Sequence, residues 1–326
     1  MRQLTYAEAL NEALREEMKR DGSIIIFGED VAAAGGVYRV TKGLLEEFGP
    51  ERVRDTPISE IAIVGMAIGA SLMGLRPVAE IMYMDFVYIA MDQLVTHAAK
   101  LRFMSGGQLK LPFVVRTQYS LGRAHGAQHS QFFPSAFLQA PGLKVVAPGT
   151  PRDAKGLLKA ALRQDSPVLF IECGYLYHRL RGEVPDQDYI TPLGRAEIKR
   201  RGTDITIACF SRTVQEALRA ADLLSAEGIE AEVLDLMTLQ PIDFEALFGS
   251  VKRTNRLLVA EDDIVTGGIG AELAARAAEE TLDYLDAPIV RVGSPPMPVP
   301  FSPELEKRYM VSAEAIAAAA KRLVRG

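Results

Sequence analysis

Stretches with the pattern of buried strands alternate with helical stretches along most of the 326-residue chain. In the first part, apolar strand-like runs occur at 23–27, 77–82, 111–116, 143–146 and 168–172, with helical or loop sequence between them. Strands that alternate with helices at this spacing favour a parallel sheet with helices on both faces. The sequence therefore predicts an α/β fold.

The alternation is interrupted once, between residues 176 and 202, where tyrosine, arginine, proline and aspartate dominate. It resumes with a strand pattern at 204–210 and continues to an alanine-rich helix near the end of the chain. A chain of this length commonly holds two domains. We expect one domain at 1–175, a linker at 176–202 and a second, smaller parallel α/β domain at 203–326.

The overall charge argues against several classes of partner. The net charge is −5, so a polyanion such as nucleic acid would not be attracted. The most apolar run, 61–75, spans about 15 residues, whereas a membrane-spanning helix needs about 20. The first residues lack the apolar core and small-residue cleavage site of a secretory leader. We therefore expect a cytoplasmic protein that binds neither nucleic acid nor membrane.

A short segment, Asp55-Thr-Pro-Ile-Ser-Glu60, leads directly into the apolar run. Pro57 favours an extended Thr56, and Ser59 is suited to cap the following helix, in which Gly65 and Gly69 would lie on one face. Glu60 has two interpretations. It could complement the dipole of the helix, or it could serve as a carboxylate in chemistry. The residues of this segment leave both open.

The segment from residue 117 to 131 reads as a long loop that carries His125 and His129. Histidines four residues apart can share a zinc ion if the segment is helical. Gly122 and Gly126 favour a loop instead, in which a histidine could bind substrate or transfer a proton. A purely structural role stays equally open on these residues.

Many segments together resemble one known family, the β subunits of the thiamine-diphosphate-dependent first component of 2-oxoacid and acetoin dehydrogenase complexes, such as pyruvate dehydrogenase. The similarity covers nearly the whole chain. It is carried by Phe27-Gly-Glu-Asp-Val31, Asp55-Thr-Pro-Ile-Ser-Glu60, Gly74-Leu-Arg-Pro-Val78, Asp85-Phe86, Met104-Ser-Gly-Gly107, Gln128-His-Ser-Gln131, Pro141-Gly-Leu-Lys-Val-Val146 and Glu232-Val-Leu-Asp235. The resemblance implies a pyrimidine-binding, transketolase-like domain followed by a transketolase-type C-terminal domain.

The resemblance also implies roles for particular residues. Glu60 would bind N1′ of the cofactor's aminopyrimidine and favour the tautomer that removes the proton from C2. Phe86 would pack on the aminopyrimidine ring, and Ile58 would border that pocket. His129 matches the family's active-site histidine, which assists transfer to the lipoyl group.

Other implications concern partners and metals. The family's diphosphate and magnesium motif, Gly-Asp-Gly followed by Asn, is absent from this chain. The resemblance implies that an α subunit supplies it within a heterotetramer (α2β2), which docks to a lipoyl-bearing acyltransferase core. Family members often hold potassium on backbone oxygens near Phe113, Ala161 and Leu162. Gln164 and Ser166 replace the usual Asp and Asn side chains there, so potassium binding is left open.

The implied activity is oxidative decarboxylation of a 2-oxoacid such as pyruvate, or cleavage of acetoin, followed by reductive acylation of a lipoyl domain. The alternative is a mainly scaffolding subunit, which orders the α chain and docks the acyltransferase core. The sequence does not choose between the substrates.

Overall fold

The computed structural model describes residues 1–326 as two compact units. Unit 1 comprises Met1–Ser120 and Phe137–Leu193, and unit 2 comprises Leu121–Ala136 and Gly194–Gly326. The loop at 121–136 is therefore grouped with unit 2, although we expected it within the first domain. The expected linker at 176–202 is divided between the units and includes two strands.

Unit 1 is built on a parallel sheet with the strand order β6-β7-β5-β4-β2-β3. A separate antiparallel pair, β1 with β8, ties the start of the chain to residues 181–184. The strands of unit 1 are β1 (Arg2–Thr5), β2 (Ile24–Gly28), β3 (Val53–Asp55), β4 (Arg76–Ile81), β5 (Val114–Tyr119), β6 (Lys144–Val146), β7 (Val168–Cys173) and β8 (Arg181–Val184).

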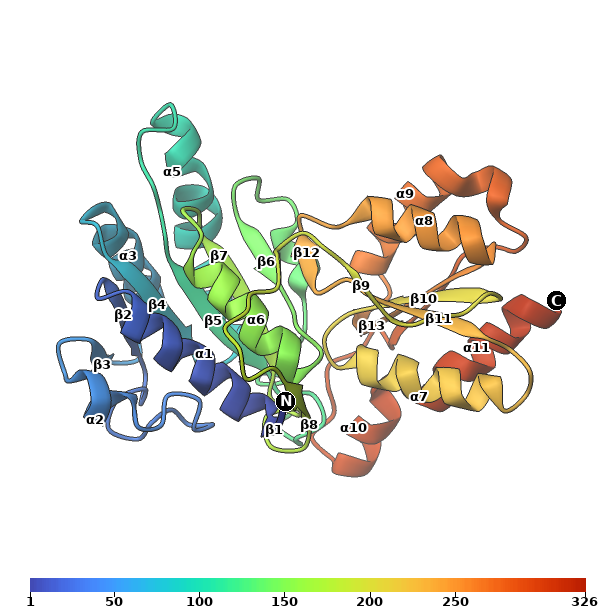
Figure 1. Ribbon diagram of the computed structural model, residues 1–326, viewed down its shortest axis with the longest axis horizontal. Helices are drawn as coiled ribbons and strands as arrows, with labels where there is room; N and C mark the ends of the chain where they lie inside the picture. Colours follow the sequence, from blue (N-terminus) through green and yellow to red (C-terminus); the bar gives the residue numbers. More distant parts are fainter. The chain divides into compact units, whose positions relative to one another are not determined.

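Helices α1 and α6 pack side by side against the sheet of unit 1 (Figure 1). A capping box begins α1, because Thr5 Oγ1 accepts a hydrogen bond from the Glu8 N–H and Glu8 accepts one from the Thr5 N–H. The helices of unit 1 are α1 (Tyr6–Arg20), α2 (Leu44–Phe48), α3 (Glu60–Leu72), α4 (Met84–Val87), a π-helix (Asp92–Ala98), α5 (Ala99–Met104), a 3₁₀ turn (Pro134–Phe137, which begins in unit 2) and α6 (Pro151–Leu162).

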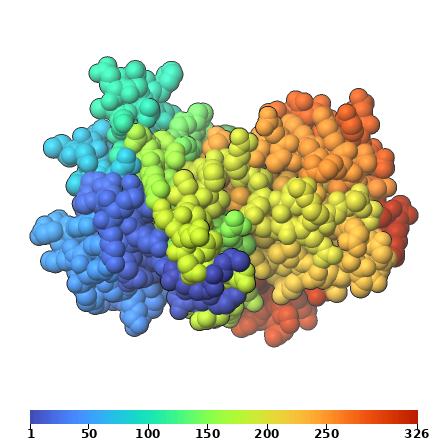
Figure 2. Space-filling model, viewed as in Figure 1, coloured from blue at the N-terminus to red at the C-terminus, as the bar shows by residue number.

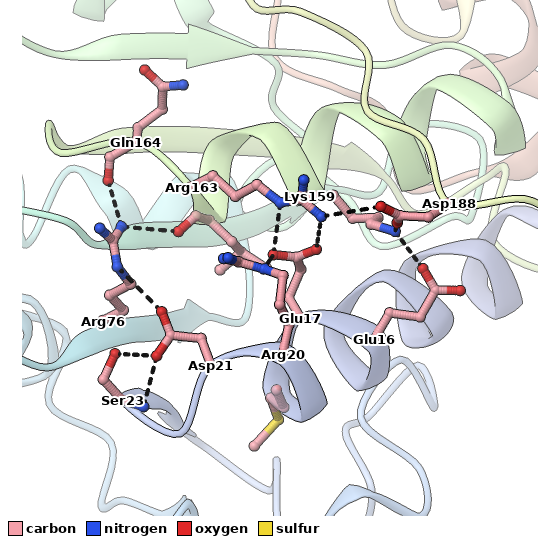
Figure 3. Close-up of polar contacts among 12 residues, drawn as sticks. Glu16, Glu17, Arg20, Asp21, Ser23, Arg76, Lys159, Arg163, Gln164 and Asp188 are labelled. Atoms are coloured by element: carbon pink, nitrogen blue, oxygen red, sulfur yellow. Dashed lines mark hydrogen bonds and ion pairs between the residues drawn. The ribbon is translucent and has the colours of Figure 1, made fainter.

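Charged side chains connect α1 to α6 and to the segment after β8 (Figure 3). The Lys159 ammonium contacts both Glu16 and Asp188, although its side chain is fully buried. Arg163 donates two hydrogen bonds to Glu17, at 2.6 and 3.0 Å. Because a buried ammonium is tolerated only when it is paired, these contacts fix how α6 lies against α1.

Unit 2 contains a mixed sheet with the order β14-β13-β10-β11-β9, in which only β9 is antiparallel. Helices α7 and α11 cover one face, and α8 and α9 cover the other (Figure 1). Its elements are β9 (Glu197–Arg200), β10 (Ile205–Cys209), α7 (Thr213–Ser225), β11 (Ala231–Asp235), β12 (Thr238–Gln240), α8 (Phe244–Thr254), β13 (Leu257–Ile264), α9 (Ile269–Thr281), a 3₁₀ turn (Leu282–Tyr284), β14 (Val290–Ser294), α10 (Pro303–Tyr309) and α11 (Ala313–Arg325).

The core of unit 2 is apolar and lies between the sheet and the α7–α11 pair. It includes Ile207, Val233 and Leu258 from the strands, and Leu224 and Ile316 from the helices, all fully buried. The predicted α/β fold is confirmed for both units.

No helix in the chain combines the length and apolar character needed to cross a lipid bilayer.

Candidate functional site

Glu60 is the first residue of α3 and is buried, with 6% of its surface exposed. Its carboxylate forms no hydrogen bond or ion pair within the chain. Ser59 occupies the position before the helix, but its hydroxyl donates to the Pro57 carbonyl at 3.1 Å, so the predicted side-chain cap is not formed. A carboxylate in this position, without an internal partner, can accept a hydrogen bond from a bound ligand.

The segment before Glu60 is anchored to the loop that follows β2. Asp55 accepts hydrogen bonds from the backbone N–H groups of Ala32, at 2.7 Å, and Ala33, at 3.2 Å. The Thr56 N–H donates to the Gly28 carbonyl at 2.9 Å. These bonds fix the entry into α3, and so they fix the position of Glu60.

A second carboxylate, Glu29, directly follows β2 and lies in the field of Glu60. Its pKa is raised first by burial and then by the nearby charges of Glu60, Asp30 and Glu80. The sequence alone indicates no role for Glu29, although this residue belongs to the segment Phe27–Val31. Glu29 lies near Glu60 because β2 pairs with β3. The periodicity of the sequence does not reveal this pairing.

Phe86 lies on the short helix α4 within an aromatic cluster. Its ring meets Tyr83 edge to face with centroids 5.6 Å apart, and Tyr83 in turn meets Tyr38 at 6.4 Å. The Tyr38 and Tyr83 hydroxyls are 2.8 Å apart and share a hydrogen bond. These contacts restrict the Phe86 ring while leaving it partly exposed, as a stacking platform requires. Ile58, by contrast, is 80% exposed.

Arg116 on β5 organises a buried charge cluster in the same unit. Its guanidinium donates to both oxygens of Glu172, at 2.7 and 2.8 Å, and to Glu80 at 2.6 Å. The Tyr177 hydroxyl donates to Glu172 at 2.7 Å. The ion pairs join side chains of three adjacent strands, β4, β5 and β7, and therefore hold these strands together.

His125 and His129 lie on the loop of unit 2, which is not helical there. The spacing of four therefore does not place them on one helical face, as a zinc pair would require. The pKa of His125 is lowered by burial and by the positive charges of Arg123 and His129, with Glu306 opposing this. His129 is half-buried.

The backbone oxygens considered for potassium all have hydrogen-bond donors from this chain. Phe113 O accepts from the Val168 N–H at 3.1 Å, Ala161 O from the Gln164 N–H at 3.1 Å, and Leu162 O from Arg76 Nη1 at 3.2 Å.

Two side-chain cations also lie at the C-terminal end of α6. Arg76 donates to the Gln164 carbonyl at 2.9 Å (Figure 3), and the Lys144 ammonium contacts the Gln164 side chain. Positive charge is therefore already provided where the ion would sit. The residues present do not fit an open potassium cage, and we derive no role for that ion.

Apolar side chains are exposed along one side of α3 and at the end of α5. They include Ile61 and Met66 on α3, Met73 just after it, and Phe103, which is 88% exposed, with Met104 beside it. The segment that contains α5 (teal) stands clear of the rest of unit 1 in Figure 2. Gly69 on α3 has no neighbouring atom within 4 Å of where a Cβ would lie. Such a surface is typical of a contact with another protein chain.

Unit 2 also holds buried carboxyl groups near the end of β13. Burial raises the pKa of Glu261 to about 7; the Gly270 N–H opposes this rise, and Asp263 adds to it. Its Oε2 accepts the Gly270 N–H at 3.0 Å, whereas its buried Oε1 has no partner. The Glu261 carboxylate therefore accepts a hydrogen bond from the first turn of α9.

Replacing Glu261 by glutamine should stabilise the protein above pH 7. An unfolded glutamate titrates near pH 4.3, so between that pH and about 7 the unfolded state loses its proton first and the stability of the unmodified protein falls. Glutamine avoids this loss, so the variant should gain on the order of 1–3 kcal/mol at pH 8 and little at pH 4.5. Urea unfolding at both pH values measures the difference. The exposed Glu272→Gln on α9 is the control, and a gain that does not change with pH would contradict the explanation.

Comparison with known proteins adds to this geometry. Residues 2–178 match the family model described as "Transketolase, pyrimidine binding domain", and residues 194–316 match "Transketolase, C-terminal domain". The chain is 45% identical to the 2-oxoisovalerate dehydrogenase subunit beta of Bacillus subtilis, over 98% of both chains. It belongs to the β subunits of 2-oxoacid and acetoin dehydrogenases.

Other members of this β-subunit family are equally similar. The acetoin:2,6-dichlorophenolindophenol oxidoreductase subunit beta of B. subtilis is 45% identical, over 97% of this chain and 95% of that one. The mitochondrial pyruvate dehydrogenase E1 component subunit beta-2 of Oryza sativa is 44% identical, over 98% of this chain and 86% of that one. Since the identities are nearly equal, they do not rank the substrates named for these relatives.

A solved structure described as "Split gene transketolase, inactive beta4 tetramer" covers 99% of this chain and 98% of its own, with a TM-score of 0.82 and 25% identity. The predicted transketolase-like architecture of this β-subunit family member is therefore confirmed. Glu60, Ile58, Phe86 and His129 all lie within the pyrimidine-binding match; the first three lie in unit 1, and His129 lies on the loop grouped with unit 2.

Proposed function

We propose that this chain is the cofactor-activating β subunit of a thiamine-diphosphate-dependent dehydrogenase that acts on a 2-oxoacid of the pyruvate type or on acetoin. The observation that carries the proposal is the buried carboxylate of Glu60, which has no partner in its own chain. A protonated ring nitrogen is the kind of donor that such a carboxylate needs. The family's pyrimidine-binding domain supplies the reason to choose the aminopyrimidine N1′ as that nitrogen.

When bound, thiamine diphosphate supplies the carbon nucleophile that attacks the carbonyl carbon of the substrate. In our proposal Glu60 would hold the proton at N1′ of the aminopyrimidine, which favours the imino tautomer, and the 4′ nitrogen of that tautomer is the base. Phe86 orients the ring by stacking, with Tyr83 restricting Phe86. Ile58 borders the same pocket, and the apolar residues of α3 keep water away from the Glu60 carboxylate. His129 assists acyl transfer to a lipoyl group.

The proposal requires an α subunit, which would hold the diphosphate and its magnesium ion in an α2β2 heterotetramer. The absence of a Gly-Asp-Gly diphosphate motif from this chain supports this division. The exposed apolar side chains of α3 and α5 support a partner chain on unit 1. The lipoyl-bearing acyltransferase core would be a further partner. The chain should therefore be inactive alone.

Replacing Gly69 by leucine should block assembly with the α subunit. The site is open within the chain, so a leucine side chain should leave the isolated fold intact but obstruct a closely approaching helix. Co-purification with a tagged α subunit, followed by size-exclusion chromatography, measures the loss. Gly22→Leu is the control, because that turn position is equally open and lies away from α3. Normal yield of the Gly69→Leu complex would show that this face is not the interface.

The substrate is tested by co-expressing this chain with the α subunit and assaying turnover with an artificial electron acceptor. Pyruvate, branched-chain 2-oxoacids and acetoin are the substrates to compare. We expect turnover of at least one of them, dependent on thiamine diphosphate and on both subunits. Turnover of none by a well-formed complex would contradict the proposed function.

A further inference from the structure

The histidine loop, Leu121–Ala136, is held by one carboxylate from the far end of the same unit. Glu306 on α10 is only 2% exposed. Its Oε1 accepts the Gly122 N–H at 2.9 Å, and its Oε2 accepts the Ala124 N–H at 2.7 Å. Both oxygens of one buried carboxylate are thus used on the backbone of this loop.

The conformation of the loop explains why a negative charge is needed there. Gly122 and Ala124 both have positive φ, 90° and 58°. Backbone N–H groups near such residues can converge into a concavity that binds anions. Ala124 is not glycine, and a left-handed conformation at such a residue is maintained only when its surroundings hold it. Glu306 provides that support.

Two further contacts fix the rest of the loop. The Phe301 ring lies against Gly126, so closely that a Cβ there would come within 3.0 Å of it. Ser135 Oγ donates to Asp263 Oδ2 at 3.3 Å. In the sequence His129 lies between Gly126 and Ser135, and its backbone N–H donates to the Gly126 carbonyl at 3.4 Å. The backbone that carries His129 therefore depends on groups from residues 263–306.

We propose that Glu306 is a positioning residue for His129, acting through the backbone of residues 122–126. This inference rests on the proposed function, in which His129 assists acyl transfer to a lipoyl group. Glu306 does not touch the reacting atoms. Its carboxylate holds the loop in the one conformation that presents the imidazole for transfer.

The substitution Glu306→Gln tests this role with almost no change in volume. Glutamine offers one acceptor oxygen for one of the two N–H groups, but its amide NH₂ faces the other N–H and repels it. The loop should loosen while the surrounding packing stays. Glu304→Gln is the matched control, since Glu304 is exposed on the same helix.

The first measurement uses the enzyme assembled with its α subunit. For Glu306→Gln we expect kcat for reductive acylation of a lipoyl domain to fall on the order of 10–100-fold, the effect of a displaced transfer group. Turnover with the artificial acceptor, which bypasses lipoyl transfer, should change little, as should both activities of Glu304→Gln. Equal losses in both assays, or no loss of acylation, would overturn the proposal.

The second measurement needs no substrate. Diethyl pyrocarbonate modification of each of the 4 histidines, followed by mass spectrometry, reports how firmly the loop is held. His129 should react several-fold faster in Glu306→Gln than in Glu304→Gln, with His97 and His178 unchanged. An unchanged His129 rate would overturn the positioning role. An assembled wild-type enzyme without any turnover would contradict the proposed function alone, and the modification rates would still test Glu306.

Discussion

Replacing Glu60 by glutamine is expected to lower turnover of the assembled enzyme by on the order of 10²–10⁴-fold, the usual contribution of a positioned acid or base. Glutamine keeps the size of the side chain, and its amide can still contact the cofactor. It cannot hold a proton at N1′, because an amide is not basic. The loss should appear mainly in kcat, with the KM for substrate changed much less, since Glu60 does not bind the substrate in this account.

The control for this substitution is Glu51→Gln, which removes an exposed carboxylate a few residues earlier. Its activity should equal that of the unmodified enzyme. Glu60→Gln should also leave the unfolding midpoint nearly unchanged, because the side chain keeps its size and no hydrogen bond of the folded chain is lost. A large loss of stability would mean that the loss of activity reports damage to α3.

Replacing Arg116 by methionine is expected to destabilise the protein by about 3–5 kcal/mol, the typical cost of breaking a buried ion pair from one side. In the unmodified protein the Arg116 guanidinium is 2% exposed and pairs with Glu172 and Glu80. Methionine fills a similar space but leaves the Glu172 carboxylate in the core with only the Tyr177 hydroxyl as partner. Urea unfolding measures the change.

Two comparisons test the cause of this loss. Adding Glu172→Gln to the Arg116→Met background should recover part of the stability, because the unpaired charge is gone. Arg54→Met breaks an exposed pair with Glu51 and should cost less than about 1 kcal/mol. Equal losses from Arg54→Met and Arg116→Met would contradict the role given to the buried cluster.

The sequence predicted the regular elements well wherever local signals define them. Thr5 with Glu8 forms a capping-box pattern that places the start of α1 correctly. Thr150-Pro151-Arg152-Asp153 likewise predicts a capped helix start, and the Thr150 side chain accepts the Asp153 N–H ahead of α6. In both cases the defining hydrogen bonds join residues three apart in the chain. Local sequence is sufficient to predict such contacts.

The sequence pattern from Phe86 to Met104, followed by Gly106-Gly107, predicts a single helix, and this prediction is wrong, because the structure has α4, a π-helix and α5 there. Its buried residues Ala90, Leu94 and Ala98 recur every fourth residue. Residues four apart lie on roughly the same side of an α-helix and also of the wider π-helix. The periodicity of the apolar residues therefore could not distinguish the two kinds of helix.

Strands β8 and β9 were also missed. Each is four residues long, and neither shows an apolar alternation. Their partners, β1 and β11, lie far away in the sequence, so only the folded chain reveals the pairing.

The same reason explains why the sequence indicates no role for Glu29 and Glu306. Their neighbours are assembled by tertiary contacts, whereas Glu60 could be selected by its matching motif.

The most direct test of the central claim is proton exchange at C2 of thiamine diphosphate bound to the assembled enzyme. Exchange into D₂O is quenched in acid and followed by NMR, so it needs neither substrate nor acyl transfer. Our account predicts that Glu60→Gln slows this exchange by on the order of 100-fold or more relative to the unmodified enzyme, with cofactor still bound. Exchange at the unmodified rate would contradict the activating role of Glu60 and favour a mainly scaffolding subunit.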